Sequence, residues 1–356
     1  MAHTHDHPGH AAHRTAGPQS GDAAPVLVEV TRGPLVESRH RGIAVVADRD
    51  GRVVLHAGDF ERPVFPRSAI KPIQAIPLVE SGAVERFGLG DAEIALACAS
   101  HSGESAHTDT VAAWLARIGC TAADLECGAQ APLDAQTAAA LARSGRTPGA
   151  LHNNCSGKHA GFLTTARARG EPTAGYRELT HPVQQRVLGV LEQMTGQDLG
   201  AAPRALDGCS IPTIAVSLGG LAVAMARFAD PVDLPERRAA AVARIRAAWA
   251  GQPRLIGGRD RFDTDMISAT GGRALTKGGA EGVHCACLPE LGLGVALKIE
   301  DGAKRAAEVA MAAVLDRLGL LDGLAPARAA RFTRSPVRTW RGLDAGEIRP
   351  AEGFPP

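Results

Sequence analysis

Lysine is scarce in this chain, and most of its positions lie beside serines and glycines. Among 39 lysines and arginines, the lysines are Lys71, Lys158, Lys277, Lys298 and Lys304. Arginine keeps its proton in proteins, whereas a buried lysine amine can lose its proton and serve as a base or a ligand. We therefore treat Lys71, Lys158 and Lys277 as candidates for chemistry, and interpret Lys298 and Lys304 as surface charges.

Ser68 and Lys71 are three residues apart, a spacing that places both on one face of a helix. Serine is a weak nucleophile until a base removes its proton, and a neutral lysine can be that base. The lysine pKa must first be lowered by burial or by a second positive charge. Pro72 and Pro77 predict that Ser68 lies at the very start of the helix and that the helix kinks later.

Two distant segments add polar groups of the same kind. Ser100 lies in the short stretch Cys98–Glu104, and Lys277 is followed by two glycines before a predicted strand. A serine–lysine pair at a helix start, a second serine and a lysine–glycine segment, in this order, resemble the three elements of the penicillin-recognising serine enzymes.

Strands at both ends of the chain and helices between them are predicted to position these residues. Alternating or continuous apolar runs predict strands at 26–30, 42–46, 53–56, 282–288 and 293–299. Helical spacing predicts helices at 104–118, 134–143, 179–196, 234–250 and 303–318. The expected fold is mixed α/β and similar to that of the serine β-lactamases: an antiparallel sheet built from both ends of the chain, flanked by helices, with a mostly helical subdomain inserted at about 91–250.

The chain is expected to contain three regions. Residues 1–25 are rich in histidine, glycine, alanine and proline and are predicted to be a disordered tail that could bind a metal loosely. Residues 26–325 form the predicted catalytic domain. Residues 326–356 are a C-terminal extension, which adds one strand near 337–340 or wraps the surface.

The composition excludes several classes of protein. With 356 residues, 45% of them hydrophobic, the chain can bury a large core. Its net charge of +1 gives no reason to expect nucleic acid or a membrane surface as a partner. No apolar run is long enough to span a bilayer, and the N-terminus lacks the pattern of a secretory signal. Seven cysteines without the spacing of a disulfide framework indicate a reducing cytoplasm.

Five segments together resemble the rhizobial-type, or class 3, L-asparaginases. These segments are Pro66–Pro72, Cys98–Glu104, Leu151–Gly161, Asp207–Pro212 and Lys277–Gly282. The resemblance extends over about residues 26–318. It implies hydrolysis of L-asparagine to L-aspartate and ammonia on a β-lactamase-like fold, by a homodimer.

The resemblance also implies two serine–lysine pairs in the active site, Ser68 with Lys71 and Ser100 with Lys277. In the first interpretation, Lys71 activates Ser68 to attack the side-chain amide, and the second pair relays protons. In the other, Ser100 is the nucleophile and Lys277 is its base. The sequence leaves this choice open.

A zinc site is implied by the resemblance, because Cys155, Lys158 and Cys209 match the residues that bind Zn²⁺ in the family. Two thiolates and an amine are a plausible ligand set with a free fourth position. Without the resemblance, the two cysteines would be interpreted as buried core residues. The sequence does not show whether the zinc is catalytic or structural.

Three further positions, Arg67, His159 and Asp207, match residues that line the substrate pocket of the family. Arg67, at a helix start, could bind a substrate carboxylate. Asp207 could bind a substrate amino group, orient a ligand, or only support its own loop. Two other functions remain open: another serine hydrolase of the penicillin-binding or β-lactamase fold, including one with glutaminase-like activity, and a non-catalytic metal-binding protein.

Overall fold

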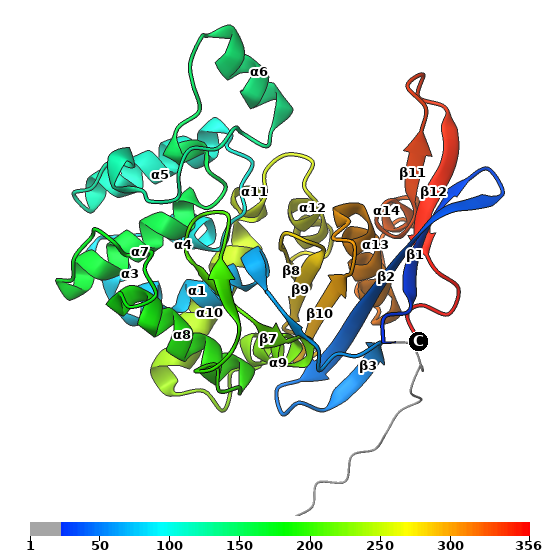
Figure 1. The fold of residues 1–356 in the computed structure, drawn as a ribbon, viewed down its shortest axis with the longest axis horizontal. Coiled ribbons are helices and arrows are strands. Elements are labelled where there is room, and N and C mark those ends of the chain that lie inside the picture. Colours follow the sequence, from blue (N-terminus) through cyan, green and yellow to red (C-terminus); the bar gives the residue numbers. More distant parts are fainter. Residues whose placement is uncertain (1–22) are drawn as a thin grey trace, which may run out of the picture.

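The computed structural model describes residues 23–356, so the predicted tail at 1–25 lies almost entirely outside the described residues. One antiparallel sheet forms the centre of the fold (Figure 1), with the strand order β11-β12-β1-β2-β10-β9-β8 and with β3 paired to β2. Its strands are β1 (Val26–Arg32), β2 (Leu35–Asp48), β3 (Val53–Ala57), β8 (Leu275–Gly278), β9 (Val283–Leu288), β10 (Leu293–Ile299), β11 (Ser335–Arg338) and β12 (Asp344–Pro350). The N-terminal strands β1 and β2 therefore lie side by side between two groups of C-terminal strands within one sheet.

Alternation along the strands divides the core into two layers. Val46 on β2 lies opposite Val295 on β10, and both belong to the cluster that packs under α13 (Lys304–Arg317). Val45 points to the opposite face, where α9 (Leu218–Ala229) covers the sheet. Gly294 permits this close packing, because a Cβ there would lie 2.0 Å from the carbonyl oxygen of Ala222.

The remaining helices form a body beside the edge of the sheet that β8 occupies (Figure 1). They are α1 (Lys71–Gln74), α2 (Ile76–Glu80), α3 (Ala83–Arg86), α4 (Asp91–Cys98), α5 (Ser105–Arg117), α6 (Ala135–Arg143), α7 (Ser156–Arg169), α8 (Pro182–Thr195), α10 (Glu236–Gly251), α11 (Pro253–Ile256) and α12 (Phe262–Ala269), with the 3₁₀ turns η1 (Arg67–Ile70), η2 (Ala122–Asp124) and η3 (Ala150–His152). Two short ribbons complete the elements there, β4 (Pro63–Val64) with β7 (Val216–Ser217) and β5 (Arg204–Leu206) with β6 (Pro212–Ile214).

The predicted mixed α/β fold with an antiparallel sheet drawn from both ends of the chain is confirmed. Helices α5, α6, α8, α10 and α13 occupy the predicted segments. Helix α7 was not predicted individually, because eleven of its 14 residues are buried and the helix therefore lacks the polar face that gives a helical pattern.

The strands differ from prediction where they are exposed. Strand β2 begins at Leu35 rather than at residue 42, and its first half carries charged side chains that pair only with β1. In the C-terminal segment, β11 covers part of the predicted strand near 337–340, and a further strand, β12, pairs with β1. Helix α14 (Pro326–Thr333) precedes them and contacts α13.

Among residues 23–356, no helix is both long and apolar enough to cross a membrane. All seven cysteines are buried and free of disulfide bonds.

Candidate active site

Ser68 lies in the turn η1, directly before the helix that begins with Lys71. Arg67 has a φ of +51°, a left-handed conformation that is uncommon for a side chain of this size. Such strain is found most often at functional sites. The predicted kink is confirmed, because the helix breaks at Ala75, between α1 and α2. The predicted helix start at Ser68 is a 3₁₀ turn, and the α-helix begins only at Lys71.

Ser100 follows α4, and its backbone N–H donates to the carbonyl of Ile256 at 3.0 Å. Lys277 lies on β8, the edge strand that faces the helical body. These two residues come from segments far apart in the chain, and the fold brings them together.

Both lysine amines contact the hydroxyl of Ser100. Lys277 Nζ donates to Ser100 Oγ at 2.8 Å and to the carbonyl oxygen of Gly278 at 2.7 Å. Lys71 Nζ lies 3.0 Å from Ser100 Oγ and donates to the carbonyl oxygen of Ala99 at 2.5 Å. Lys71, Ser100 and Lys277 therefore form one hydrogen-bonded cluster.

Ser68 lies at the same site but outside this cluster. The Lys71 backbone N–H donates to the Ser68 carbonyl, but within residues 23–356 no hydrogen bond joins the Ser68 hydroxyl to the Lys71 amine. That amine donates instead to Ser100 and to the carbonyls of Ala99 and Asn154. The side chains of the first expected pair, Ser68 with Lys71, are thus not hydrogen-bonded to each other, whereas those of the second, Ser100 with Lys277, are.

Burial controls the charge of both lysines. Each has an exposed fraction of 0%. Burial lowers the pKa of Lys277 to about 7, with the positive charge of Lys71 acting in the same direction and the carboxylate of Asp263 opposing it. Burial also lowers the pKa of Lys71. At neutral pH a substantial fraction of Lys277 is a free amine, able to accept a proton.

Ser68 and Ser100 open onto one cavity of about 160 Å³. Its other walls come from the loop before α7, the start of α12, the β8–β9 hairpin and the start of α13: Asn154, Arg261, Phe262, Asp263, Gly278, Gly279, Ala280, Val283, His284, Lys304, Ala307 and Glu308. This volume holds a small molecule, because one water needs only about 10–15 Å³ on this measure.

The three candidate zinc ligands lie together and are buried. Cys155, Cys209 and Lys158 are 5%, 4% and 2% exposed, and Lys158 Nζ lies 3.0 Å from Cys209 Sγ. A hydrogen bond from Cys209 lowers the pKa of Cys155, and the charge of Lys158 acts in the same direction. In the described part of the chain, no three or more histidines, cysteines and carboxylates lie close enough together to hold a metal ion. This cluster differs from such a group because it contains two cysteines and the amine of a lysine. Two buried sulfurs and a nitrogen at one point fit Zn²⁺ chemically.

The three candidate substrate residues divide into a pair and a single histidine. Arg67 Nε lies 2.9 Å from Asp207 Oδ1, beside a cavity of about 20 Å³. Burial opposes ionisation of Asp207, but Lys158 and Arg67 outweigh it and lower the pKa of the carboxyl. His159 is fully buried, with Nδ1 bonded to the Tyr176 hydroxyl at 2.8 Å and Nε2 without a partner among the described residues.

Two residues at the serine cavity were not identified from the sequence. Asp263 on α12 and His284 on β9 form a buried pair, with 2.9 Å between Oδ1 and Nε2. Neither lies in a recognisable motif, so only their position in the fold reveals them.

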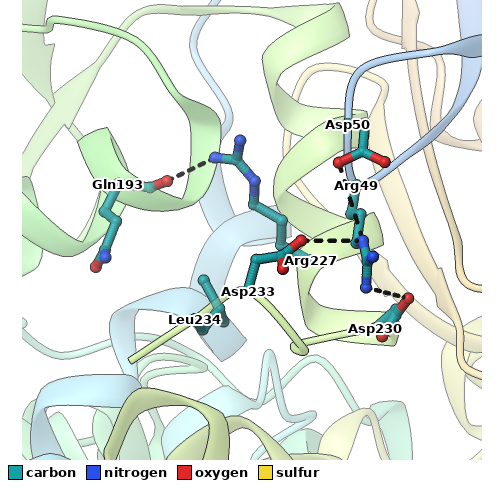
Figure 2. A pocket seen from close by; sticks show the side chains of 7 residues that line it. All are labelled: Arg49, Asp50, Gln193, Arg227, Asp230, Asp233 and Leu234. Atoms are coloured by element: carbon teal, nitrogen blue, oxygen red, sulfur yellow. Dashed lines mark hydrogen bonds and ion pairs between the residues drawn. The ribbon is translucent and has the colours of Figure 1, made fainter. Parts of the chain in front are cut away.

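A larger cavity, of about 340 Å³, lies elsewhere and is unsuited to this chemistry. Its wall contains Arg49, whose guanidinium is paired with Asp230 at 2.8 Å and with Asp233 at 3.2 Å (Figure 2). Arg227, on the same wall, donates to the backbone carbonyl of Gln193. Serine, cysteine and lysine are absent from this wall, so it cannot supply the serine–lysine chemistry expected from the sequence.

Comparison with known proteins gives one family and a set of distant structures. A family model described as L-asparaginase II matches residues 28–350. No curated protein matches the chain. Solved structures of Mglu, in a native form at 4.3 M NaCl and in a tris and glutamate form, are each 14% identical, with TM-scores of 0.44 and 0.46. The two alignments cover 80% and 85% of this chain, but only 63% and 64% of the length of the Mglu chains. A β-lactamase from Mycobacterium bovis, Mb2281c, is 14% identical with a TM-score of 0.36, over 87% of this chain and 97% of its own.

Proposed function

This chain belongs to the L-asparaginase II family, whose model matches residues 28–350, and on that premise we propose that it hydrolyses L-asparagine to L-aspartate and ammonia. The family resemblance seen in the sequence is confirmed by this match. One observation carries the proposed chemistry: the hydroxyl of Ser100 lies within hydrogen-bond distance of two buried lysine amines.

We propose that Ser100 is the nucleophile and Lys277 its base. Neutral Lys277 takes the hydroxyl proton, and Ser100 Oγ attacks the carbon of the side-chain amide. The amide C–N bond then breaks while the ester C–O bond remains, and the Lys277 ammonium returns its proton to the departing nitrogen, which leaves as ammonia. Lys277 then takes a proton from water, whose oxygen attacks the ester carbon. As the ester C–O bond breaks, the Lys277 ammonium returns that proton to Ser100 Oγ, which releases aspartate and restores the hydroxyl and the neutral amine.

Lys71 in this scheme supplies charge and position. As an ammonium it donates to Ser100 Oγ and to two backbone carbonyls, which fixes the hydroxyl and favours the neutral form of Lys277. Ser68, on the wall of the same cavity, is proposed to hold the substrate amide. The alternative, in which Lys71 activates Ser68, requires the Lys71 amine to leave Ser100.

Cys155, Cys209 and Lys158 are the residues proposed to hold a zinc ion. When bound, Zn²⁺ supplies a fixed positive charge and Lewis acidity beside the substrate pocket. The buried amine of Lys158 must lose its proton to join the two sulfurs as a ligand, so zinc binding should release protons.

Recognition of the amino-acid head group is assigned to Arg67 and Asp207, with His159 as a further polar group. The guanidinium suits the α-carboxylate and the carboxylate suits the α-ammonium. Since their own cavity is about 20 Å³, the Arg67–Asp207 ion pair must separate when substrate enters. Their proximity to the serine cavity follows from the chain itself, because Arg67 directly precedes Ser68.

Ammonia release by the purified protein tests the activity, with L-asparagine and L-glutamine assayed in parallel. We expect turnover of asparagine that is lost in Ser100→Ala. Glutamine turnover alone would replace the substrate assignment, and covalent labelling by a penicillin without amide turnover would select a β-lactamase-type hydrolase. The homodimer is also proposed, and sedimentation of the same preparation tests it.

A further inference from the structure

Asp263 holds the strand segment that carries the candidate base, although it does not contact the lysine itself through a hydrogen bond. Its Oδ2 accepts the backbone N–H of Gly278 at 3.0 Å. The carbonyl of the same Gly278 accepts from Lys277 Nζ at 2.7 Å, and Lys277 Nζ reaches Ser100 Oγ at 2.8 Å. The carboxylate, the Gly278 residue, the amine and the serine hydroxyl thus form a chain of contacts.

The second oxygen of Asp263 is fixed as firmly as the first. Oδ1 lies 2.9 Å from His284 Nε2, and the His284 side chain is 3% exposed. Phe262 stacks edge-on against the His284 ring, with ring centroids 5.2 Å apart. With both oxygens engaged, the carboxylate cannot turn away from the strand, so its charge stays beside Lys277.

The carboxylate is charged despite its burial. Burial disfavours ionisation of Asp263, but His284, Lys277 and the Gly278 amide together outweigh it and lower its pKa. A buried carboxylate near a buried amine favours the protonated amine. The other ionisable groups that act on Lys277 are Lys71 and Arg261, which disfavour its ammonium, and the thiolate of Cys155, whose negative charge favours it. Cys98 and Cys285 also lie within electrostatic range, with thiol pKa values that burial raises to about 12, so both are neutral.

We propose that Asp263 is a positioning residue for the reaction, which aligns the Lys277 amine with Ser100 through Gly278 and balances the charge that Lys277 gains when it takes the serine proton. This assignment rests on the proposed role of Lys277 as the base. It adds a residue outside the five segments that carry the family resemblance, and it explains why the lysine–glycine segment is tied to α12.

The pH profile of kcat/KM in Asp263→Asn tests the proposal. The asparagine side chain keeps an oxygen for the Gly278 amide but removes the negative charge, so the ammonium form of Lys277 loses support. We expect the acid limb, the part of the profile in which kcat/KM rises with pH, to move to lower pH by about one unit. The plateau, the constant value of kcat/KM at higher pH, should also be lower. Asp263→Glu retains the charge and should return the limb towards its wild-type position.

Two matched variants separate charge from structure. Asp265→Asn removes a carboxylate from the same helix, outside the serine cavity, and should leave the limb in place. His284→Gln removes the imidazole and leaves the Asp263 charge, so it should lower the plateau more than it moves the limb. An Asp263→Asn profile with an unmoved acid limb would overturn the proposal, whatever its plateau.

A direct titration keeps the test independent of turnover. Because the chain has only five lysines, ¹³C labelling of lysine can resolve the Lys277 signal, identified by its loss in Lys277→Arg. We expect its midpoint near neutral pH in the wild-type protein and lower in Asp263→Asn, or in Asp263→Ser if the asparagine variant does not fold. Equal midpoints would overturn the inference. Absence of amide hydrolysis would overturn the proposed function and leave this titration interpretable.

Discussion

The rise of kcat/KM with pH on the acid side of the profile is the consequence of the site that can be predicted most quantitatively. Burial of Lys277 lowers its pKa to about 7, against about 10.4 for a free lysine. The base is active only as the neutral amine, so kcat/KM should rise with pH through this value. Relative to the plateau, we expect about half the activity at pH 7, about a tenth at pH 6 and about nine-tenths at pH 8.

The assay is ammonia release at low L-asparagine concentration, where the rate reports kcat/KM and therefore the free enzyme. Thermal melting over the same pH range separates titration from unfolding. Because the folded pKa of Lys277 lies below the unfolded one, burial of Lys277 destabilises the fold fully below about pH 7, and this penalty decreases as the pH rises from about 7 to about 10.4.

Lys277→Arg is the matched variant, because it keeps a positive charge that cannot be removed at these pH values. Loss of a general base costs about 10²- to 10⁴-fold in rate, and we expect a loss in this range at every pH. A wild-type profile that is flat between pH 6 and 8, or an arginine variant within a few-fold of wild type, would refute the assignment of Lys277 as the base.

Three further predictions concern the neighbourhood of this cluster. Lys71→Met removes a positive charge that lowers the pKa of Lys277, so the acid limb should move to higher pH; a limb that stays in place while activity disappears would instead identify Lys71 as the base. Gly157→Ala should destabilise the fold by about 1–3 kcal/mol in a denaturant titration, because the added Cβ would lie 2.3 Å from the Leu96 carbonyl oxygen, and unchanged stability would show that α7 can shift. Cys209→Ser should reduce bound zinc from one per chain, measured by elemental analysis after dialysis, whereas full occupancy would exclude this sulfur as a ligand.

The sequence predicts which segments meet, but not which atoms bond within the site. The serines, the lysines and the strand–helix–strand order identified the segments that meet, because each lies in a polar stretch between apolar elements. The pairing of Ser100 with Lys277 came only from the family resemblance. The preference of Lys71 for Ser100 was not predictable. Its acceptors at Ala99 and Asn154 are backbone carbonyls of distant segments, and no side-chain pattern marks them.

Asp263 and strand β12 were missed for related reasons. Asp263 lies in the first turn of α12, where an acidic residue is common on any helix, so its type carries no signal of a site. Strand β12 contains charged residues and Gly346 and is only half-buried, so its pattern is weak. Its strand conformation comes from pairing with β1, over 300 residues away in sequence.

Identification of the acylated residue is the most direct test of the central claim. Wild-type protein mixed with L-asparagine, quenched in acid and digested, should yield a peptide with one aspartyl ester, and fragmentation should locate that ester. We predict that Ser100 carries it and that Ser100→Ala does not form it. An ester on Ser68, or steady turnover with no ester at either serine, would contradict the account.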